Sequence, residues 1–232
     1  MVFITAEIGV NWDGDFNLAE RMMVEAKKAD CSAVKFQAFN ENIVKEHPEK
    51  ERLLKTAISS ENIKKIDSIA KKVGIEWYCT PMYPESIDFL DPYVNRYKIR
   101  FHDGLDLHQN KTNKIISKVL ESDKELIISS QKSPKNLEIY ENSNVKWLYV
   151  VPNYPCKLEE LDFSNLKDFD GYSNHCTHIM APLTAVILGA KMLEIHTTIN
   201  KKKNFVDNNV SFDSADLIEL INLIKISKRI HR

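Results

Sequence analysis

Short apolar runs alternate with longer amphipathic segments along the whole chain. Several of the runs, such as ELIISS and KWLYVV, are apolar on both faces, which is typical of parallel strands covered by helices. The runs predict eight strands, at Val2–Ile8, Ala33–Ala38, Glu76–Thr80, Arg96–Arg100, Glu125–Ser130, Lys146–Val151, Gly171–His175 and Met192–Thr198.

The segments between these strands carry the 3.6-residue period of amphipathic helices. Three sets of apolar residues each share one helical face: Leu18, Met22, Ala26 and Ala29; Ile63, Ile66, Ala70 and Val73; and Leu217, Leu220, Ile221 and Ile224. Asp213 stands where the N-cap of the last helix is expected, and the basic tail Lys225–Arg232 is expected to be the solvated end of that helix. The polar stretch Asn40–Ser60 predicts a long loop or a small excursion after the second strand.

Eight strands, each followed by a helix or a connection of helical length, predict an α/β fold, the (β/α)8 TIM barrel. The length of 232 residues suits a single domain over residues 1–232. A doubly wound open sheet is the alternative. That fold would usually need a Gly-rich first turn for a nucleotide, and ITAEIGVNWDGD is not one.

Composition narrows the classes of function. The formal net charge of −1 offers no electrostatic reason to expect a nucleic-acid partner. No stretch approaches the roughly 18 consecutive apolar residues of a membrane span, and the N-terminus lacks the basic start of a signal peptide. The four widely spaced cysteines are expected to be reduced thiols. We therefore expect a cytoplasmic protein that has neither a membrane nor a nucleic acid as partner.

A barrel of this kind places its functional groups at the carboxyl ends of its strands. Polar residues occur at or just beyond these ends: Glu7, Asn11, Lys35, Gln37, Thr80, Lys98, Ser129, Asn153, Tyr154, Ser173, His175, Glu194 and His196. Lys35 and Lys98 would each need an anionic partner, because an unpaired buried ammonium is costly. A ligand that carries phosphate or carboxylate would supply that partner.

Two histidines suggest a metal site. His175 and His196 end adjacent predicted strands and could reach one divalent ion, although a hydrogen-bonded core histidine is the alternative for each. Strand one neighbours strand eight in a closed barrel, so Glu7 could add a carboxylate. The three side chains would form an open site for Mn²⁺ or Mg²⁺.

A set of strings points to a known family. AEIGVNWDGD, AVKFQAF, YCTP, YKI, NYP, GYSNH, LGAKMLEIHTTI and VDNNVS follow one another in this order and cover nearly all of the chain. Together they resemble the N-acetylneuraminate (sialic acid) synthase family, whose members condense phosphoenolpyruvate with N-acetylmannosamine or a related amino sugar. The resemblance implies a (β/α)8 barrel, a requirement for Mn²⁺ or Mg²⁺, and release of inorganic phosphate.

The resemblance also implies roles for individual residues. His175 and His196 match the metal-binding histidines, and Glu7 matches the acidic residue at the reacting centre. The positions around phosphoenolpyruvate are matched by Lys35, Thr80, Lys98, Ser129 and Ser173, and those near the sugar by Gln37, Tyr154 and Asp207. We expect Glu7, Lys35 and Lys98 to be catalytic, and we add Asn11 and Asn153 to the expected substrate contacts.

The chain departs from the family pattern in several places. Arg100 and Phe101 replace a small residue and a serine, which removes a hydroxyl expected beside the phosphate. The sequence ends with the last barrel helix, where family members usually add an antifreeze-like domain whose arginine completes the partner subunit's sugar site. We therefore expect a more open sugar pocket, and either a homodimer or a separate small partner domain. The alternative function is a non-catalytic or partner-dependent barrel that binds sugar or phosphate.

Overall fold

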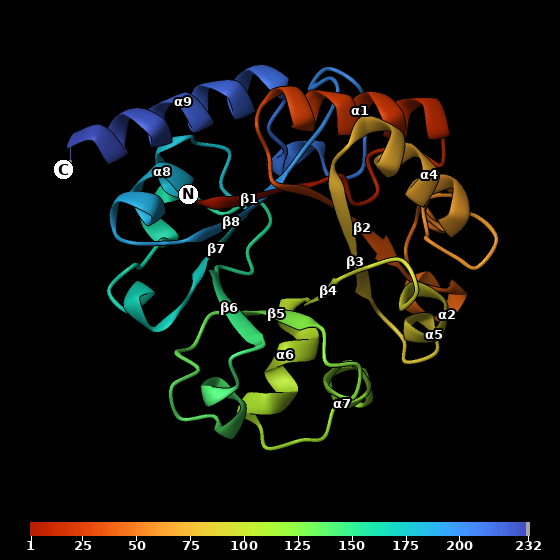
Figure 1. Ribbon diagram of the computed structural model, residues 1–232, viewed down its shortest axis with the longest axis horizontal. Helices are drawn as coiled ribbons and strands as arrows, with labels where there is room; N and C mark the ends of the chain where they lie inside the picture. Colours follow the sequence, from red (N-terminus) through yellow and green to blue (C-terminus); the bar gives the residue numbers. More distant parts are fainter. Residues whose placement is uncertain (231–232) are drawn as a thin grey trace.

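Eight parallel strands close into a barrel in the computed structural model, which describes residues 1–230 (Figure 1). Each strand pairs with the next along the chain, and β8 pairs with β1. The strands are β1 Phe3–Glu7, β2 Ala33–Ala38, β3 Glu76–Pro81, β4 Arg96–Ile99, β5 Glu125–Ser130, β6 Val145–Val150, β7 Gly171–Asn174 and β8 Met192–His196. The predicted barrel is confirmed, with every strand end within two residues of its expected place.

Helices surround the barrel on its outside. They are α1 Phe16–Lys28, α2 Glu41–Val44, α3 Lys50–Leu54, α4 Ile63–Val73, α5 Ser86–Leu90, α6 Phe101–His108, α7 Lys114–Leu120, α8 Met180–Ile187 and α9 Ser214–Ile230. The connections β5–β6 and β6–β7 contain only 3₁₀ turns among the elements found there, at Glu138–Glu141, Leu158–Glu160 and Leu166–Asp168. The last two residues of the basic tail, 231–232, lie outside the described residues.

The last helix illustrates how the apolar period places a helix on the barrel. The four residues predicted to share one face of α9 are all buried: Leu217, Leu220, Ile221 and Ile224. The Asp213 carboxylate accepts hydrogen bonds from the backbone N–H groups of Ala215 and Asp216, which confirms it as the N-cap. A buried aliphatic face of this kind supplies about 1.5–3 kcal/mol per side chain and holds the helix against the strands.

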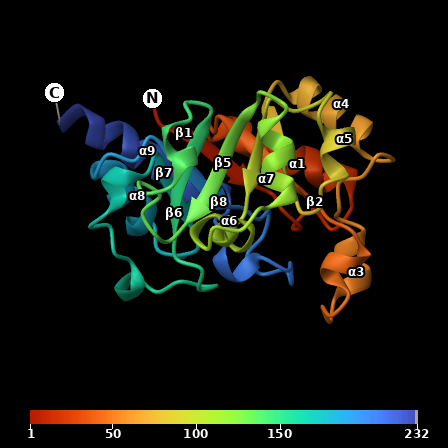
Figure 2. The same ribbon diagram turned by 90° about the horizontal axis from the view of Figure 1, so that it is seen from below.

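The predicted excursion after β2 is also confirmed and contains the helices α2 and α3. Figure 2 shows α3 projecting from the barrel. A second small apolar core of Val10, Phe39, Leu53 and Ala57 attaches it to the loop after β1. Arg52 strengthens this attachment, since its Nε donates to Asp13 Oδ1 at 2.8 Å. The excursion therefore packs over the carboxyl end of the barrel.

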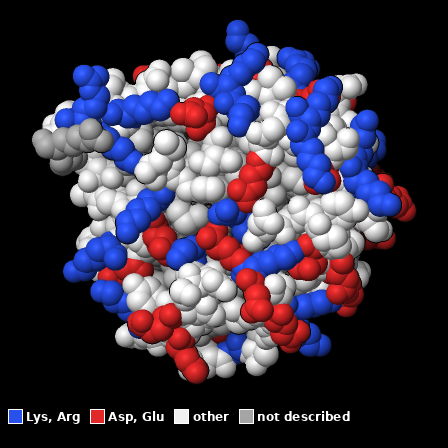
Figure 3. All heavy atoms as spheres, viewed as in Figure 1, with Lys and Arg blue, Asp and Glu red and all other residues white. Residues whose placement is uncertain are grey.

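The surface agrees with the balanced composition. Figure 3 shows lysine and arginine side chains interspersed with aspartate and glutamate over the face that it presents.

Within residues 1–230, no helix has the length and apolar character needed to span a bilayer. The four cysteines are buried and form no disulfide, as expected.

Gly171 allows two strands of the barrel to approach closely. A Cβ atom at this position would lie 2.0 Å from the backbone oxygen of Met192 on β8. Since this oxygen belongs to the backbone of a paired strand, it cannot move away without disturbing the barrel.

We predict that Gly171→Ala lowers the free energy of unfolding by about 3 kcal/mol or more, because the added methyl group overlaps the β8 backbone. Gly74→Ala is the control: its φ of 72° also disfavours a side chain, but open space surrounds the position. It should cost about 1 kcal/mol. Equal losses in the two variants, measured by urea unfolding, would contradict the explanation based on strand contact.

Candidate active site

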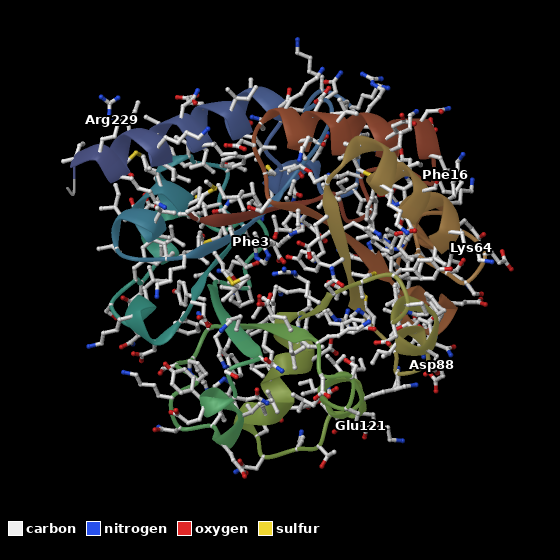
Figure 4. The ribbon with its side chains drawn as sticks, viewed as in Figure 1. Phe3, Phe16, Lys64, Asp88, Glu121 and Arg229 are labelled. Atoms are coloured by element: carbon white, nitrogen blue, oxygen red, sulfur yellow. The ribbon has the colours of Figure 1, made fainter. Side chains whose placement is uncertain are left out.

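A cavity of about 290 Å³ opens at the carboxyl ends of the strands, at the lower end of the sizes usual for small-molecule sites. Every one of the eight strands contributes at least one residue to its wall. Figure 4 shows side chains filling the centre of the ring of strands, while the labelled Lys64, Asp88 and Glu121 lie at its periphery. The cavity is therefore a property of the whole barrel.

Four charged residues form the floor of this cavity, and none is more than 4% exposed: Glu7, Lys35, Lys98 and Glu194. Lys35 Nζ lies 2.9 Å from Glu7 Oε2 and 3.7 Å from Glu194 Oε2. Lys98 Nζ lies 3.8 Å from Glu194 Oε1. Each buried ammonium group thus has at least one carboxylate partner within the protein, as burial of a charge requires.

Three hydroxyl groups predicted for the site contact this cluster. Lys35 Nζ donates to Thr80 Oγ1 at 2.9 Å, and Lys98 Nζ donates to Ser129 Oγ at 2.7 Å. The Ser173 hydroxyl donates to Glu194 Oε1 at 2.9 Å. The structure therefore brings Lys35, Thr80, Lys98, Ser129 and Ser173 together around one polar floor.

The charges of the cluster respond differently to burial. Burial lowers the pKa of Lys98 to about 8, although Glu194 opposes the shift. Burial also acts against the charge of Lys35, but the carboxylates of Glu194 and Glu7 outweigh it and raise the pKa of Lys35. The same two lysines overcome desolvation at Glu194 and lower its pKa to about 2. Lys98 is therefore the lysine of the floor that loses its proton first.

Glu7 differs from Glu194 because desolvation dominates at its position. Burial raises the pKa of Glu7, and the opposing attraction of Lys35 is smaller. Gln37 Nε2 donates to Glu7 Oε1 at 2.8 Å. A carboxyl group with a raised pKa in a cavity is suited to accept and return a proton.

The two histidines predicted to bind metal both line the cavity, and their ring centroids are 5.6 Å apart. His175 Nδ1 lies 2.9 Å from the backbone oxygen of Val151, and since a carbonyl only accepts, this nitrogen carries the proton. Burial lowers the pKa of His175 to about 4, so the ring is neutral at pH 7 and its Nε2 offers a lone pair. This is the arrangement usual for an imidazole that binds a metal.

The residues of the pair therefore fit a divalent ion as two imidazole ligands. A third ligand is not found beside them: in the described chain, no three His, Cys, Asp or Glu side chains are grouped to hold a metal ion. Glu7 pairs in register with His196, but its carboxylate is engaged by Lys35 and Gln37. Other ligands would have to come from water or a substrate.

Tyr154 and Asp207 lie beside the histidines, as expected for residues near a substrate. The Tyr154 ring packs against both imidazoles, with centroid distances of 4.9 Å to His175 and 5.5 Å to His196. Asp207 Oδ2 lies 3.6 Å from His196 Nδ1, and this neighbour helps to raise the pKa of His196 against the effect of burial. Both side chains therefore help to orient His196.

Two predicted substrate contacts require correction. Asn11 is fully buried, and its Nδ2 donates to the Thr197 backbone oxygen at 2.8 Å and to Ser211 Oγ at 3.0 Å. Its Oδ1 accepts from the backbone N–H of Asp207 at 3.0 Å, so Asn11 holds the Asp207 loop in place, and it does not line the cavity. Asn153 lies off the cavity wall and donates to Glu160 Oε1 at 2.6 Å.

Glu194 is a site residue without a predicted role. Two signals pointed to it: its two-residue spacing from His196 on one strand, and the need of two buried lysines for anionic partners. Arg100, Phe101 and His102, at the start of α6, also line the cavity.

Comparisons with known proteins find a family and several similar chains. The model of the NeuB family matches residues 22–231. An uncharacterized protein of Methanocaldococcus jannaschii is 28% identical over 98% of this chain and 71% of its own length. The N-acetylneuraminate-9-phosphate synthase of Mus musculus is 28% identical over 98% of this chain and 70% of its own. The N,N'-diacetyllegionaminic acid synthase of Legionella pneumophila is 26% identical over 96% of this chain and 71% of its own length.

Solved structures show the same architecture. The N-acetylneuraminic acid synthetase of Leptospira borgpetersenii superposes with a TM-score of 0.86 at 27% identity, over 99% of this chain and 85% of that one. A truncated 3-deoxy-D-arabino-heptulosonate 7-phosphate synthase of Thermotoga maritima superposes with a TM-score of 0.72 at 12% identity, and this similarity concerns the fold alone.

We predict that Glu194→Gln strongly destabilises the barrel. The amide keeps the shape of the side chain but removes the negative charge that faces both lysines. The free energy of unfolding at pH 7 should fall by about 3–5 kcal/mol, as when one partner of a buried ion pair is removed. Glu41→Gln, which alters the exposed pair with Lys50, should leave the urea midpoint nearly unchanged.

The pH dependence of stability provides a second measurement of this effect. The pKa of Glu194 is about 2 in the folded chain and close to 4.5 in an unfolded one. Its stabilising contribution is therefore complete above pH 4.5 and is lost as the pH falls toward 2. The difference between wild type and Glu194→Gln should narrow over this range, and a constant difference would contradict the assignment.

Proposed function

The chain belongs to the NeuB family, and from this we propose that it condenses phosphoenolpyruvate with an amino sugar. The acceptor would be an N-acetylmannosamine-like aldose, and the products a sialic acid-like nonulosonate and phosphate. Named relatives are synthases of N-acetylneuraminate-9-phosphate, legionaminic acid and pseudaminic acid, which supports a synthase of sialic acid type.

The observation that carries the proposal is the pair of buried lysines with their hydroxyl partners. Phosphoenolpyruvate presents a phosphate and a carboxylate on a three-carbon frame. Lys35 with Thr80, and Lys98 with Ser129, offer two cationic donor sets on one cavity floor. Charge-assisted hydrogen bonds from such groups suit both anionic ends of this substrate.

The proposed reaction joins two carbon atoms and releases phosphate. C3 of phosphoenolpyruvate attacks the aldehyde carbon of the sugar, and the aldehyde oxygen takes up a proton to become a hydroxyl group. Water adds to the electron-poor C2 and loses a proton. The C2–O bond to phosphate then breaks, and the remaining hydroxyl group loses its proton to give the ketone.

Glu7 is the residue that we assign to proton movement. Its pKa is raised by burial, so it can hold a proton for the aldehyde oxygen and afterwards accept one from the attacking water. Gln37 holds one carboxyl oxygen of Glu7 by its 2.8 Å hydrogen bond and so fixes the direction of the other. Tyr154 lines the cavity and is partly exposed, and we assign it to contact with the sugar.

His175 and His196 would hold the divalent ion, Mn²⁺ or Mg²⁺. A bound ion would stabilise the negative charge that develops on the aldehyde oxygen. The protein prepares the pair by giving His175 Nδ1 a backbone acceptor and His196 Nδ1 the neighbours Asp207 and Tyr154. These contacts hold each ring through its Nδ1, which would leave the Nε2 atoms for the ion.

We expect the purified chain with Mn²⁺ or Mg²⁺ to release phosphate only when phosphoenolpyruvate and an amino sugar are both present. Lys98→Met should reduce the rate by about 100-fold or more, because a charged donor at the reacting centre is lost. Lys111→Met, on the exposed surface, is the matched control. N-acetylmannosamine and its 6-phosphate should both be tested as acceptors.

The outcome separates this function from its alternative. Binding of phosphoenolpyruvate without phosphate release across a panel of amino sugars would favour a barrel that binds but does not turn over, or that needs a partner. Absence of both binding and release would contradict the proposed substrate.

The pKa of Lys98 predicts how donor binding changes with pH. Because Lys98 loses its proton near pH 8, the affinity of the metal-free protein for phosphoenolpyruvate should fall as the pH rises from 7 to 9. Calorimetric titration measures this change. In Lys98→Met the affinity should be low and nearly constant over the same range, and an unchanged pH dependence in this variant would assign the effect to another group.

A further inference from the structure

We infer that Arg100 binds the phosphate group of the donor, as the cation at the rim of the cavity above the paired lysines. The inference rests on the proposed function and gives a binding role to a residue that departs from the family pattern.

The course of the chain directs Arg100 into the cavity. Strand β4 ends at Ile99, and the backbone stays extended at Arg100, with φ −72° and ψ 163°. Residues two apart on extended backbone project to the same side, so Arg100 follows Lys98 about 6–7 Å further along the strand direction. Both residues line the cavity, but Lys98 is 2% exposed whereas the Arg100 side chain is 35% exposed. One lies on the floor and the other at the rim.

The charge balance of the floor explains why a further cationic donor at the rim would favour binding of the donor substrate. Lys35 and Lys98 are matched by Glu7 and Glu194, so the floor as a whole offers no excess positive charge. Phosphoenolpyruvate brings a carboxylate and a phosphate, both ionised at neutral pH. Among the described residues, Arg100 is the remaining lysine or arginine on the cavity wall.

The present contacts of Arg100 leave part of its guanidinium for a ligand. Its Nε donates to Asp103 Oδ2 at 2.6 Å, and its Nη2 lies 3.4 Å from Asp103 Oδ1. Nη1 makes no hydrogen bond to any residue in the described part of the chain. Asp103 therefore holds the planar fork in one orientation, and the free edge of the fork suits two oxygens of a phosphate.

The test measures binding of phosphoenolpyruvate alone by calorimetric titration, and Michaelis constants for donor and acceptor where turnover occurs. Arg100→Gln should weaken donor binding by about 10- to 100-fold, as expected when a hydrogen-bonded charge partner is removed. Arg100→Lys should recover part of this loss, because it keeps the charge but lacks the fork. Lys111→Gln, which removes an exposed charge away from the cavity wall, should bind phosphoenolpyruvate as the wild type does.

Asp103→Asn changes the partner of Arg100 while the charge of Arg100 is kept. It removes a carboxylate that both orients the guanidinium and competes with phosphate for it, so donor binding should stay much closer to that of the wild type than in Arg100→Gln. Since Arg100 is partly exposed, all variants should keep the thermal unfolding midpoint within a few degrees, and this is checked first.

Two results would overturn the role of Arg100 alone. One is wild-type affinity for phosphoenolpyruvate in Arg100→Gln. The other is a raised Michaelis constant for the sugar with an unchanged constant for the donor, which would place Arg100 at the acceptor. A wild-type protein that does not bind phosphoenolpyruvate would overturn the proposed function together with this inference.

Discussion

Two lysines and two glutamates buried in one barrel mouth must neutralise one another, and the rest of the site is arranged around this requirement. Lys35 lies between Glu7 and Glu194, and Glu194 in turn reaches Lys98. The pairing works only in a closed barrel, since it joins β1, β2, β4 and β8. Removal of one charge leaves the others without compensation in a low-dielectric setting, so the cluster ties the stability of the fold to the chemistry of the site.

The site has two parts with different properties. The lysine cluster is enclosed and nearly fixed in charge, except that the lowered pKa of Lys98 brings its titration close to neutral pH. The histidine pair lies toward Tyr154, which is 40% exposed, so this part is open to a larger substrate. A small donor held over the cluster and a sugar entering beside the histidines would meet at Glu7, whose raised pKa suits it to proton transfer.

Loops beyond the strands hold this arrangement in place. Asn11 joins the loop after β1 to the backbone of Thr197 and Asp207, and so positions the carboxylate beside His196. Gly9 has a φ of 53°, and a Cβ there would lie 3.1 Å from Glu7 Oε1. The turn after β1 therefore requires glycine both for its backbone conformation and for the space that the site occupies.

The sequence by itself determined the strands, the closed barrel and most of the residues that meet in the cavity. Two-residue spacing on buried strands is a local property, and it placed Lys35 and Gln37 on one inward face and Glu194 and His196 on another. Spacing alone does not show which buried groups pair, because partners such as Asn11 and Asp207, or Lys98 and Glu194, are far apart along the chain. Only the tertiary structure decided that Asn11 is engaged by Thr197, Ser211 and Asp207, that the Glu7 carboxylate pairs with Lys35, and that Arg100 reaches the rim of the cavity.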